Sequence, residues 1–272
     1  MIRANWNESQ LDFLRKHRIK CFDGGVIHID SSEKYAIFKN ELSDVKLIFN
    51  RLSGVIFDKE EFDNSKNYMC HNTAASVAVP LELDNDYHFY LDKAFGDYCV
   101  SCNNIPTQEQ IGPLIFEREP TLPKRSLWGG YNGIGGYLLT DKEKYKLLKN
   151  KWGFSSREIL IGKNEMKSKN FVQLDIDISP SSLAFGDSLF GKTVEDHPDV
   201  CHSCNRTLYS NSILDFFPTF EHDFNFDIVL TQEWFGWFKR LVVSRRFAHW
   251  MVENGFAKMS SSFFIPTQKF EV

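Results

Sequence analysis

The sequence predicts an α+β protein with mixed, mostly antiparallel sheets and few helices. Three observations support this fold class. Candidate strands are short and are separated by turn residues along most of the chain. A unit of strand, Ser/Thr-capped helix, glycine stop and second strand occurs twice, over residues 137–161 and 241–265. Each unit follows a Cys-x-x-Cys segment, termed a hook. Cys99 and Cys102 bound the first hook, and Cys201 and Cys204 bound the second.

The region before the first hook contains one predicted helix and several short strands. Residues 8–17 carry apolar side chains at Leu11, Phe13 and Leu14 and predict a helix. Residues 41–50 fit either a helix or a strand, and the charged residues 58–67 fit a loop or a fraying helix. Strands are predicted at residues 26–29, 35–38, 55–57 and 74–83, the last confined to a sheet edge by its proline.

Loop structure is predicted between the first hook and the first helix unit. Four prolines interrupt this part of the chain, and residues 129–136 contain five glycines. The glycine-rich run has no Gly-Lys-Ser/Thr and does not open a helix, so it does not match a phosphate-binding loop. A turn or a close backbone contact is the expected role.

The first helix unit has clear start and stop signals. Thr140 and Glu143 have the spacing of a capping box, and Gly153 suits the left-handed position that ends a helix. Tyr145, Leu148 and Trp152 recur at helical spacing and predict one buried stripe. Strands are predicted on either side of this helix, at residues 137–139 and 158–161.

The second unit repeats this order. Residues 241–243 predict a strand, Ser244 a helix cap and Gly255 a helix stop, with the chain extended again at residues 262–265. Phe247, Trp250 and Met251 predict the buried stripe. The repetition indicates either an old duplication or two uses of a common unit. Between the units, residues 171–178 alternate apolar and polar side chains and predict a strand.

The two hooks together predict a structural Zn²⁺ site. A Cys-x-x-Cys turn places two sulfurs about one tetrahedral edge apart, and two such turns supply the four thiolates of a closed zinc site. The expected ligands are Cys99, Cys102, Cys201 and Cys204. Such a site has no open position for water, so the metal braces the fold and catalyses nothing. A disulfide within each hook and four buried thiols without metal are the alternatives.

Neighbouring residues refine the zinc prediction. Asn103 and Asn205 follow the second cysteine of each hook, and asparagine is the best substitute for glycine in the left-handed conformation that such a turn requires. His202 lies inside the second hook and either replaces a cysteine as a ligand or faces solvent. Cys21 and Cys70 have no hook partner and are expected to be isolated buried thiols.

Composition indicates a globular protein of the cytoplasm. The chain is 42% hydrophobic and 25% charged, begins without the apolar run of a signal peptide and lacks a stretch of about 20 apolar residues. Thiols stay reduced in the cytoplasm, which favours metal over disulfide at the hooks. The net charge of −4 argues against a nucleic-acid partner. The 25 phenylalanines suit either a phenylalanine-rich core or a sticky contact surface.

One acidic stretch is a candidate contact surface. Residues 187–227 contain eight acids and two bases, a local balance of −6. The candidate partner-binding residues within it are Glu195, Asp196, Asp199, Glu221, Asp223 and Asp227. Phe216, Phe217, Phe220, Phe224 and Phe226 alternate with these acids and are either exposed anchors or core residues. An ordinary solvated loop is the alternative to an interface.

No catalytic residues are predicted. The sequence has neither a His-Glu-x-x-His nor a Gly-x-Ser-x-Gly motif. Cys70 and His71 are adjacent, so on a strand their side chains point to opposite faces. An enzyme would need a site of another kind, such as a deep pocket with converging ionisable groups in the N-terminal half.

The order of features resembles the bacterial double-CxxCG motif family. The resemblance rests on the two hooks, the glycine-rich run, the capped helix, the alternating strand and a closing Val242-Val243-Ser244, helix, Asn254-Gly255 element. It covers about residues 95–266. Asn103 and Asn205 stand where the family has glycine. We therefore divide the chain into an N-terminal α+β region, residues 1–94, and a double-CxxC immunity-like domain, residues 95–272.

This family looks related to the immunity proteins of polymorphic and contact-delivered toxin systems. The resemblance implies a cytoplasmic protein that binds the catalytic domain of a cognate toxin and blocks it. The expected partner is that toxin, with neither nucleic acid nor membrane involved, and the chain itself is expected as a monomer or a small homo-oligomer. The acidic stretch would suit a basic nuclease toxin. A zinc-ribbon adaptor or nucleic-acid-binding module is the alternative function.

Overall fold

The computed structural model describes most of the chain after residue 92 and shorter segments before it. The described residues are 2–4, 6–22, 26–28, 34, 37–38, 41, 47–50, 57, 59–70, 93–102, 105–106, 110–130, 137–185, 199–209, 216–235, 238–260 and 263–268.

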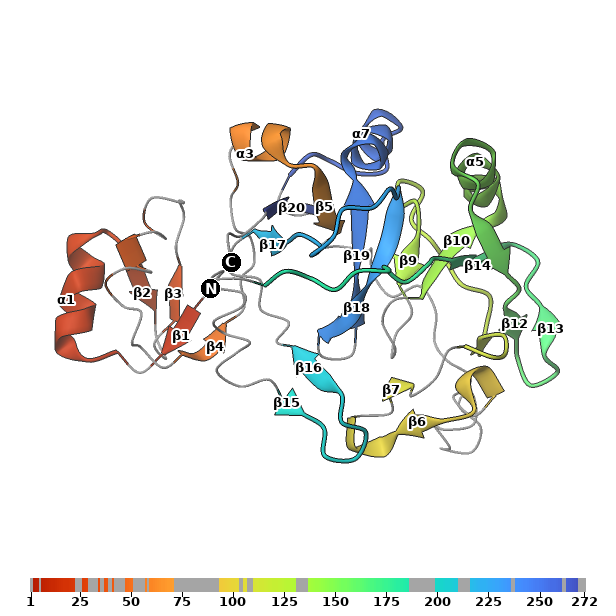
Figure 1. Ribbon diagram of the computed structural model, residues 1–272, viewed down its shortest axis with the longest axis horizontal. Helices are drawn as coiled ribbons and strands as arrows, with labels where there is room; N and C mark the ends of the chain where they lie inside the picture. Colours follow the sequence, from red (N-terminus) through yellow and green to blue (C-terminus); the bar gives the residue numbers. More distant parts are fainter. Residues whose placement is uncertain are drawn as a thin grey trace.

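A seven-stranded sheet occupies the middle of the molecule (Figure 1). Its strand order is β15 (Asp199–Val200), β16 (Thr207–Tyr209), β18 (Ile228–Phe235), β19 (Phe238–Ser244), β5 (Asn67–Cys70), β20 (Phe264–Gln268) and β17 (Phe217–Pro218). The pairs β16–β18 and β17–β20 are parallel, and the other pairs are antiparallel. The predicted α+β class with mostly antiparallel sheets is therefore confirmed.

Two further sheets lie at the end of the molecule drawn on the right in Figure 1. The four-stranded one has the order β11 (Ser155–Arg157), β14 (Phe171–Asp175), β10 (Leu138–Asp141) and β9 (Gly129–Gly130). The three-stranded one has the order β13 (Met166–Lys167), β12 (Leu160–Ile161) and β8 (Ile115–Phe116). The first two glycines of the glycine-rich run thus belong to an edge strand, and residues 131–136 lie outside the described part of the chain.

The N-terminal segment forms a small sheet with one helix at the opposite end (Figure 1). The strand order is β2 (Lys20–Phe22), β3 (Val26–His28), β1 (Ile2–Ala4) and β4 (Leu47–Asn50). The predicted helix is present as α1 (Glu8–Lys16), which begins at Asn7 with a capping box completed by Gln10. Leu14, Ile19, Ile27 and Phe38 form its core.

The structure bears on two open predictions and one mistaken prediction in this segment. Within residues 41–50 the described strand is β4 (Leu47–Asn50), and within residues 58–67 the chain forms α3 (Lys59–Asn64). The strand predicted at residues 35–38 is wrong at Ile37 and Phe38, which are helical. The short apolar run Ala36-Ile37-Phe38 fits either structure, so its pattern does not decide between them. The strands predicted at residues 55–56 and 74–83 lie outside the described residues.

Residues from the expected N-terminal region contribute to the main sheet. β5 lies between β19 and β20 and pairs antiparallel with both. Tyr68 and Met69 in β5 are fully buried, and the Tyr68 hydroxyl donates a hydrogen bond to the Phe62 carbonyl at 2.6 Å. The sheet therefore runs across the boundary expected at residue 94.

The first predicted helix is present as α5 (Lys142–Trp152), but its capping box is not formed by Thr140 and Glu143. Asp141 is the N-cap and accepts a hydrogen bond from the Lys144 N–H at 2.9 Å. Thr140 is fully buried in β10 and donates to the Leu127 carbonyl at 2.7 Å. Because the Thr140 hydroxyl is hydrogen-bonded to the Leu127 carbonyl and does not cap the helix, the helix begins one residue later than predicted. Gly153 ends it with φ +73°, as expected.

The second predicted helix is present as α7 (Arg245–Glu253). Ser244 caps it by accepting from the Phe247 N–H at 3.2 Å, and Gly255 follows with φ +74°. Phe247, Trp250 and Met251 are buried, which confirms the predicted stripe. Among the described residues no helix has the length and apolar character needed to cross a membrane.

The two helix units share one topology, in which an antiparallel strand separates the strands before and after the helix. β10 precedes α5 and β11 follows it, and both pair with β14. β19 precedes α7 and β20 follows it, and both pair with β5. In each unit the flanking strands therefore run parallel to each other with one strand between them.

The register of the inserted strand repeats as well. The N-cap Asp141 lies opposite Phe171, the first residue of β14. The N-cap Ser244 lies opposite Asn67, the first residue of β5. The start of each helix is thus placed at the same position relative to its inserted strand.

Equivalent hydrogen bonds tie each helix to its inserted strand. The Lys142 N–H, first in α5, donates to the Asn170 carbonyl just before β14 at 2.9 Å. The Arg245 N–H, first in α7, donates to the Lys66 carbonyl just before β5 at 3.0 Å. β5 lies before the first helix unit in sequence, but it pairs with the flanking strands of the second unit. β14 lies after the helix of the first unit and pairs with the flanking strands of that same unit. Both a duplication and two uses of a common unit remain consistent with this arrangement.

An aromatic cluster joins the two helices, which lie side by side at the top of Figure 1. Phe247 of α7 is fully buried, and its ring centroid lies 5.0 Å from Trp152 of α5 and 5.4 Å from Trp250. Trp128 and Phe154 approach the same ring at 5.9 Å each. The two helix units therefore share one hydrophobic core, which contains several phenylalanines.

Candidate functional site

The hooks meet in space, as the zinc prediction requires. The Sγ atoms of Cys99, Cys201 and Cys204 all lie within 4.8 Å of one another. Cys99 ends β6 (Tyr98–Cys99), which pairs with β7 (Ile105–Pro106), and the other two cysteines lie in the turn between β15 and β16. This group of thiols can hold a metal ion. The backbone of Cys102 lies in a short 3₁₀ helix (Val100–Cys102), and its side chain is outside the described part of the chain.

Local hydrogen bonds shape the second hook. The Cys201 N–H donates to the Arg206 carbonyl at 2.9 Å, and the Asn205 N–H donates to the Cys201 carbonyl at 2.8 Å. Asn205 has φ +53°, the left-handed conformation predicted for this position. The turn therefore holds Cys201 and Cys204 on the same side. Asn103, the corresponding residue of the first hook, lies outside the described residues.

Equivalent residues of the hooks face each other. The Cys99 and Cys201 Sγ atoms are 3.6 Å apart, and the Ser101 and Ser203 hydroxyls are 2.7 Å apart. Each pair is separated by 102 positions in sequence. Contacts between equivalent residues are the signature of a local two-fold axis.

His202 in the second hook is exposed, in keeping with the alternative that its side chain faces solvent.

Trp234 of β18 packs beside the thiol group. It is partly buried and packs against Cys99 together with Cys201 and Cys204. The Arg206 guanidinium lies 4.9 Å and the Lys239 ammonium 5.4 Å from the centroid of its ring. No local pattern in the sequence predicts Trp234 as part of this site, because its contacts arise only from the fold. The thiol group and two cations thus share one tryptophan.

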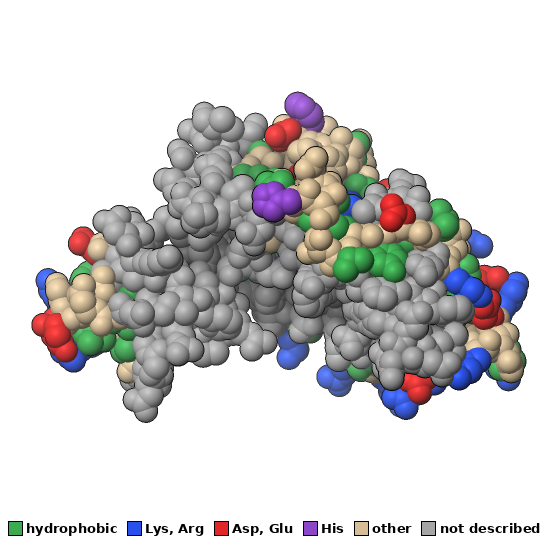
Figure 2. Space-filling view, turned by 90° about the horizontal axis from the view of Figure 1, so that it is seen from below, with side chains coloured by type: hydrophobic (Ala, Val, Ile, Leu, Met, Phe, Trp, Pro, Cys, Tyr) green, Lys and Arg blue, Asp and Glu red, His purple; other side chains and the backbone are tan. Residues whose placement is uncertain are grey.

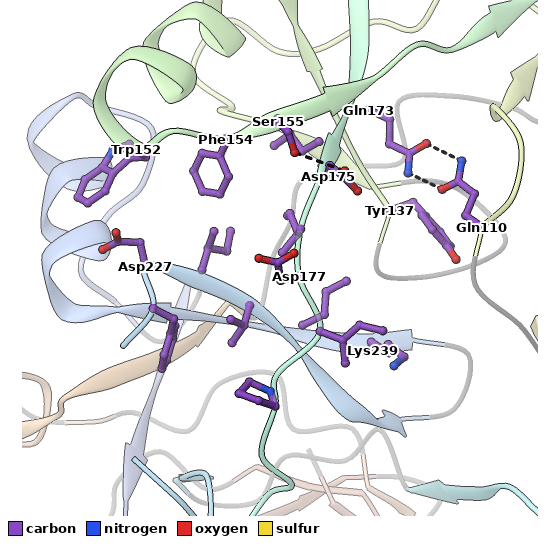
Figure 3. Close-up of a pocket in the computed structure, with 18 of the residues that line it drawn as sticks. Gln110, Tyr137, Trp152, Phe154, Ser155, Gln173, Asp175, Asp177, Asp227 and Lys239 are labelled. Carbon is purple, nitrogen blue, oxygen red and sulfur yellow. Dashed lines mark hydrogen bonds between the residues drawn. The ribbon is translucent and has the colours of Figure 1, made fainter. Parts of the chain in front are cut away.

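A cleft of about 1040 Å³ begins at this tryptophan and extends between β11 and β14 on one side and β18 and β19 on the other (Figure 3). Its partly buried aromatic side chains are Tyr137, Trp152, Phe154, Phe224, Phe226 and Trp234. Gln110 and Gln173 form a reciprocal amide pair at one end, with N–O distances of 3.0 and 2.6 Å. The cleft is open to solvent, and its volume lies at the upper end of the range found for small-ligand sites.

Three carboxylates face the cleft, and two of them are neutralised within the fold. Asp175 accepts from the Arg157 Nε at 3.0 Å. Asp227 accepts from two nitrogens of Arg246, at 2.9 and 2.7 Å, which raises the pKa of that guanidinium. Asp177 is exposed at the centre of the view in Figure 3, and within the described residues its carboxylate has no ion-pair or hydrogen-bond partner.

The predicted acidic contact residues are only partly described. Glu221 and Asp223 are exposed, and Asp223 lies 3.6 Å from Lys66. Asp227 is engaged by Arg246 and by the Ser244 hydroxyl. Asp199 lies in β15 with its side chain outside the described residues, and Glu195 and Asp196 are outside them altogether.

The phenylalanines between these acids either belong to the hydrophobic core or pack against it. Phe217 and Phe220 are buried, and Phe216, Phe224 and Phe226 are partly buried against the same hydrophobic core.

The two cysteines outside the hooks, Cys21 and Cys70, differ from each other in burial. Cys70 is buried, and burial raises the pKa of its thiol, as expected of an isolated core cysteine. Cys21 is exposed, so the expectation that it is buried was wrong.

Comparison with protein-family models, curated proteins and solved structures found no match to this chain.

Proposed function

We propose that this chain is an immunity protein that binds a cognate bacterial toxin in the cytoplasm, with a structural Zn²⁺ held by Cys99, Cys102, Cys201 and Cys204. The observation that carries the proposal is the convergence of the two hooks, which are the most specific part of the resemblance to the double-CxxCG family. Three of their thiols lie within 4.8 Å of one another. The toxin-binding role rests on that resemblance.

The local two-fold arrangement supports Cys102 as the fourth ligand. Cys99 corresponds to Cys201 and Ser101 to Ser203, with the same sequence separation in both pairs. The residue that corresponds to Cys204 under this relation is Cys102. A two-fold axis places equivalent groups at equivalent distances from a point on it. A metal on the axis that binds Cys204 would therefore meet Cys102 as well.

A four-thiolate site supports a binding role for the protein rather than metal-dependent catalysis. Zn²⁺ is bound by four sulfurs in structural sites, whereas a catalytic zinc keeps one position for water. The metal would join the β6–β7 pair to the turn between β15 and β16, at one edge of the seven-stranded sheet. Its contribution is to fix the relative position of the halves of the chain.

The test of the proposed function is rescue from a toxin. The C-terminal domain encoded by the neighbouring open reading frame is expressed in cells with and without this protein, and growth and co-purification are measured. We expect growth arrest by that domain alone and rescue with a stable complex. A matched pair of variants, Cys21→Ser and Cys204→Ser, separates the role of the hooks from that of an ordinary exposed thiol. A domain that is toxic but not neutralised by the wild-type protein would contradict the proposal.

A nucleic-acid-binding module is a second candidate, because one end of the molecule is basic. Residues 117–169 contain twelve Lys or Arg and six Asp or Glu, a balance of +6. Lys and Arg side chains, with some acids among them, gather at the right-hand end of the molecule in Figure 2. Binding to DNA or RNA that weakens steeply with salt would support this candidate. Absence of binding at low salt would remove it.

A further inference from the structure

The cleft has the composition of a protein-binding surface. Six partly exposed aromatic side chains line it, with Arg206 and Lys239 at the tryptophan end. Aromatic residues and arginine dominate the residues that contribute most to protein–protein binding, especially in concave regions from which a partner excludes water. Three carboxylates and three cations line the cleft, so it lacks the net positive charge that binding of a phosphate backbone requires. The open shape of the cleft and its aromatic walls therefore fit a protein segment.

The charge of that segment follows from the carboxylates. Arg157 neutralises Asp175, and Arg246 neutralises Asp227 with two hydrogen bonds. Asp177 is the remaining carboxylate of the cleft, and its side chain makes no ion pair in the described part of the chain. A lysine or arginine of a partner would supply the missing cation. Its aliphatic stem would lie against the aromatic walls, where a cation also gains from the ring faces.

The backbone holds Asp177 in place for this contact. The Leu230 N–H donates to the Asp177 carbonyl at 2.9 Å, and the Ser179 N–H donates to the Leu230 carbonyl at 2.8 Å. Ile178 and Leu230 thereby form a parallel bridge that joins the segment after β14 to β18. A carboxylate on backbone bonded in this way needs little reordering when a partner arrives, which favours binding.

We infer that this cleft receives a loop of the cognate toxin, with a lysine or arginine of that loop paired to Asp177. The inference rests on the proposed function, since the occupant is the toxin. The thiol group contributes indirectly, because Trp234 at one end of the cleft packs against Cys99, as Cys201 and Cys204 do. A metal bound there would fix the position of this tryptophan and of the Arg206 and Lys239 side chains over its ring.

The first arm of the test compares charge variants in the full-length protein. Asp177→Asn and Asp177→Lys are measured for affinity to the purified toxin domain by calorimetry, and for rescue of growth. We expect a roughly 30-fold loss of affinity or more for Asp177→Asn, and a larger loss for Asp177→Lys. Glu253→Lys is the matched control, because Glu253 is an exposed carboxylate outside the cleft lining. Thermal unfolding of each variant shows whether it is folded.

The second arm locates the contact. Benzoylphenylalanine is introduced at Ser155, which is exposed in the cleft, or at Lys163, which is exposed outside it, and each complex is irradiated. We expect cross-links to the toxin from position 155 and none from position 163. Wild-type affinity in Asp177→Lys, or cross-links from position 163 alone, would overturn the cleft assignment while the proposed function stood. Failure of the wild-type protein to bind or to rescue would overturn both.

Discussion

The Sγ atom of Cys99 lies 3.6 Å from the Sγ atom of Cys201, although 102 positions separate the two residues. Free thiols can make such a contact, and thiolates can do so only around a cation that offsets their charge. The contact occurs beside Cys204 and beside a hydroxyl pair formed by Ser101 and Ser203. The geometry thus makes metal content the first property to measure.

We expect one Zn²⁺ per chain. Cobalt substitution should produce the charge-transfer absorption of a tetrahedral thiolate site, and Cys102→Ser and Cys204→Ser should lose the metal and more than about 2 kcal/mol of stability. Cys21→Ser is the control and should change neither, because Cys21 is exposed and outside the thiol group. Metal content by mass spectrometry and urea unfolding measure both effects. Full metal content in Cys204→Ser would refute the assignment.

Asn205 should be replaceable by glycine but not by a branched residue. Its φ of +53° costs a residue with a branched side chain about 1–2 kcal/mol, whereas glycine adopts it freely. Asn205→Gly should therefore keep stability and metal affinity within error. Asn205→Val should lose about 1–2 kcal/mol and bind metal more weakly, because the turn that orients Cys201 and Cys204 is strained. Equal behaviour of the two variants in urea unfolding would argue against this explanation.

The local elements were predictable because their signals lie within a few residues. The stripe of Phe247, Trp250 and Met251 and the stop at Gly255 follow from helical spacing and from glycine conformation. Asn205 in the second hook is another such signal, since only a few residue types tolerate positive φ.

Long-range relations were not predictable from these patterns. β5 and β14 are short strands, and their sequences do not indicate with which helix unit each strand pairs. The displaced helix cap has a similar origin: both Thr140 and Asp141 carry a suitable oxygen, and only the Leu127 carbonyl, brought near by the fold, decides between them. Trp234 and Asp177 were not predicted as site residues for the same reason, because only the fold brings them to the thiol group and into the cleft.

Asp141 rather than Glu143 should be needed at the start of α5. Asp141 accepts from the Lys144 N–H, whereas Glu143 is exposed and pairs with Lys146 at the surface. Asp141→Ala should cost about 1 kcal/mol, the usual effect of losing an N-cap. Glu143→Ala should cost less than about 0.5 kcal/mol, as for an exposed ion pair. Urea unfolding of the two variants compares them directly. A larger loss of stability in Glu143→Ala than in Asp141→Ala would support the capping box predicted from the sequence.

Phe247 should be the most sensitive position of the shared core. It is fully buried and contacts aromatic rings from both helix units, including Trp152 at 5.0 Å. Phe247→Ala should lose about 3–5 kcal/mol because it leaves a large cavity between α5 and α7. Leu147→Ala is the surface control, since Leu147 on α5 is 49% exposed and should change stability by less than about 0.5 kcal/mol. A loss below about 1 kcal/mol in Phe247→Ala would mean that the halves do not share this core.

Glu233 should make stability fall as pH rises above the acidic range. Its Oε1 accepts from the Leu183 N–H at 2.9 Å, while its Oε2 is buried and without a hydrogen-bond partner in the described structure. Burial raises the pKa of this carboxyl above its usual 4.5, opposed by the Leu183 hydrogen bond. A raised folded-state pKa means that the folded protein binds the proton more tightly than the unfolded chain. The contribution of Glu233 is therefore present below pH 4.5 and is lost as pH rises through the folded-state pKa.

Glu233→Gln removes this dependence, because the amide oxygen still accepts from Leu183 and no charge is buried. The variant should be more stable than the wild type at neutral pH, and the difference should shrink as pH falls toward 4.5. Glu253→Gln is the control, because Glu253 is an exposed carboxylate and is not among the charges that act on Glu233, and it should change stability by less than about 0.5 kcal/mol. Urea unfolding across this pH range, with metal content followed in the same samples, separates the carboxyl effect from loss of metal. A Glu233→Gln protein that is less stable at neutral pH would show that the charged carboxylate is stabilised by contacts that outweigh its burial.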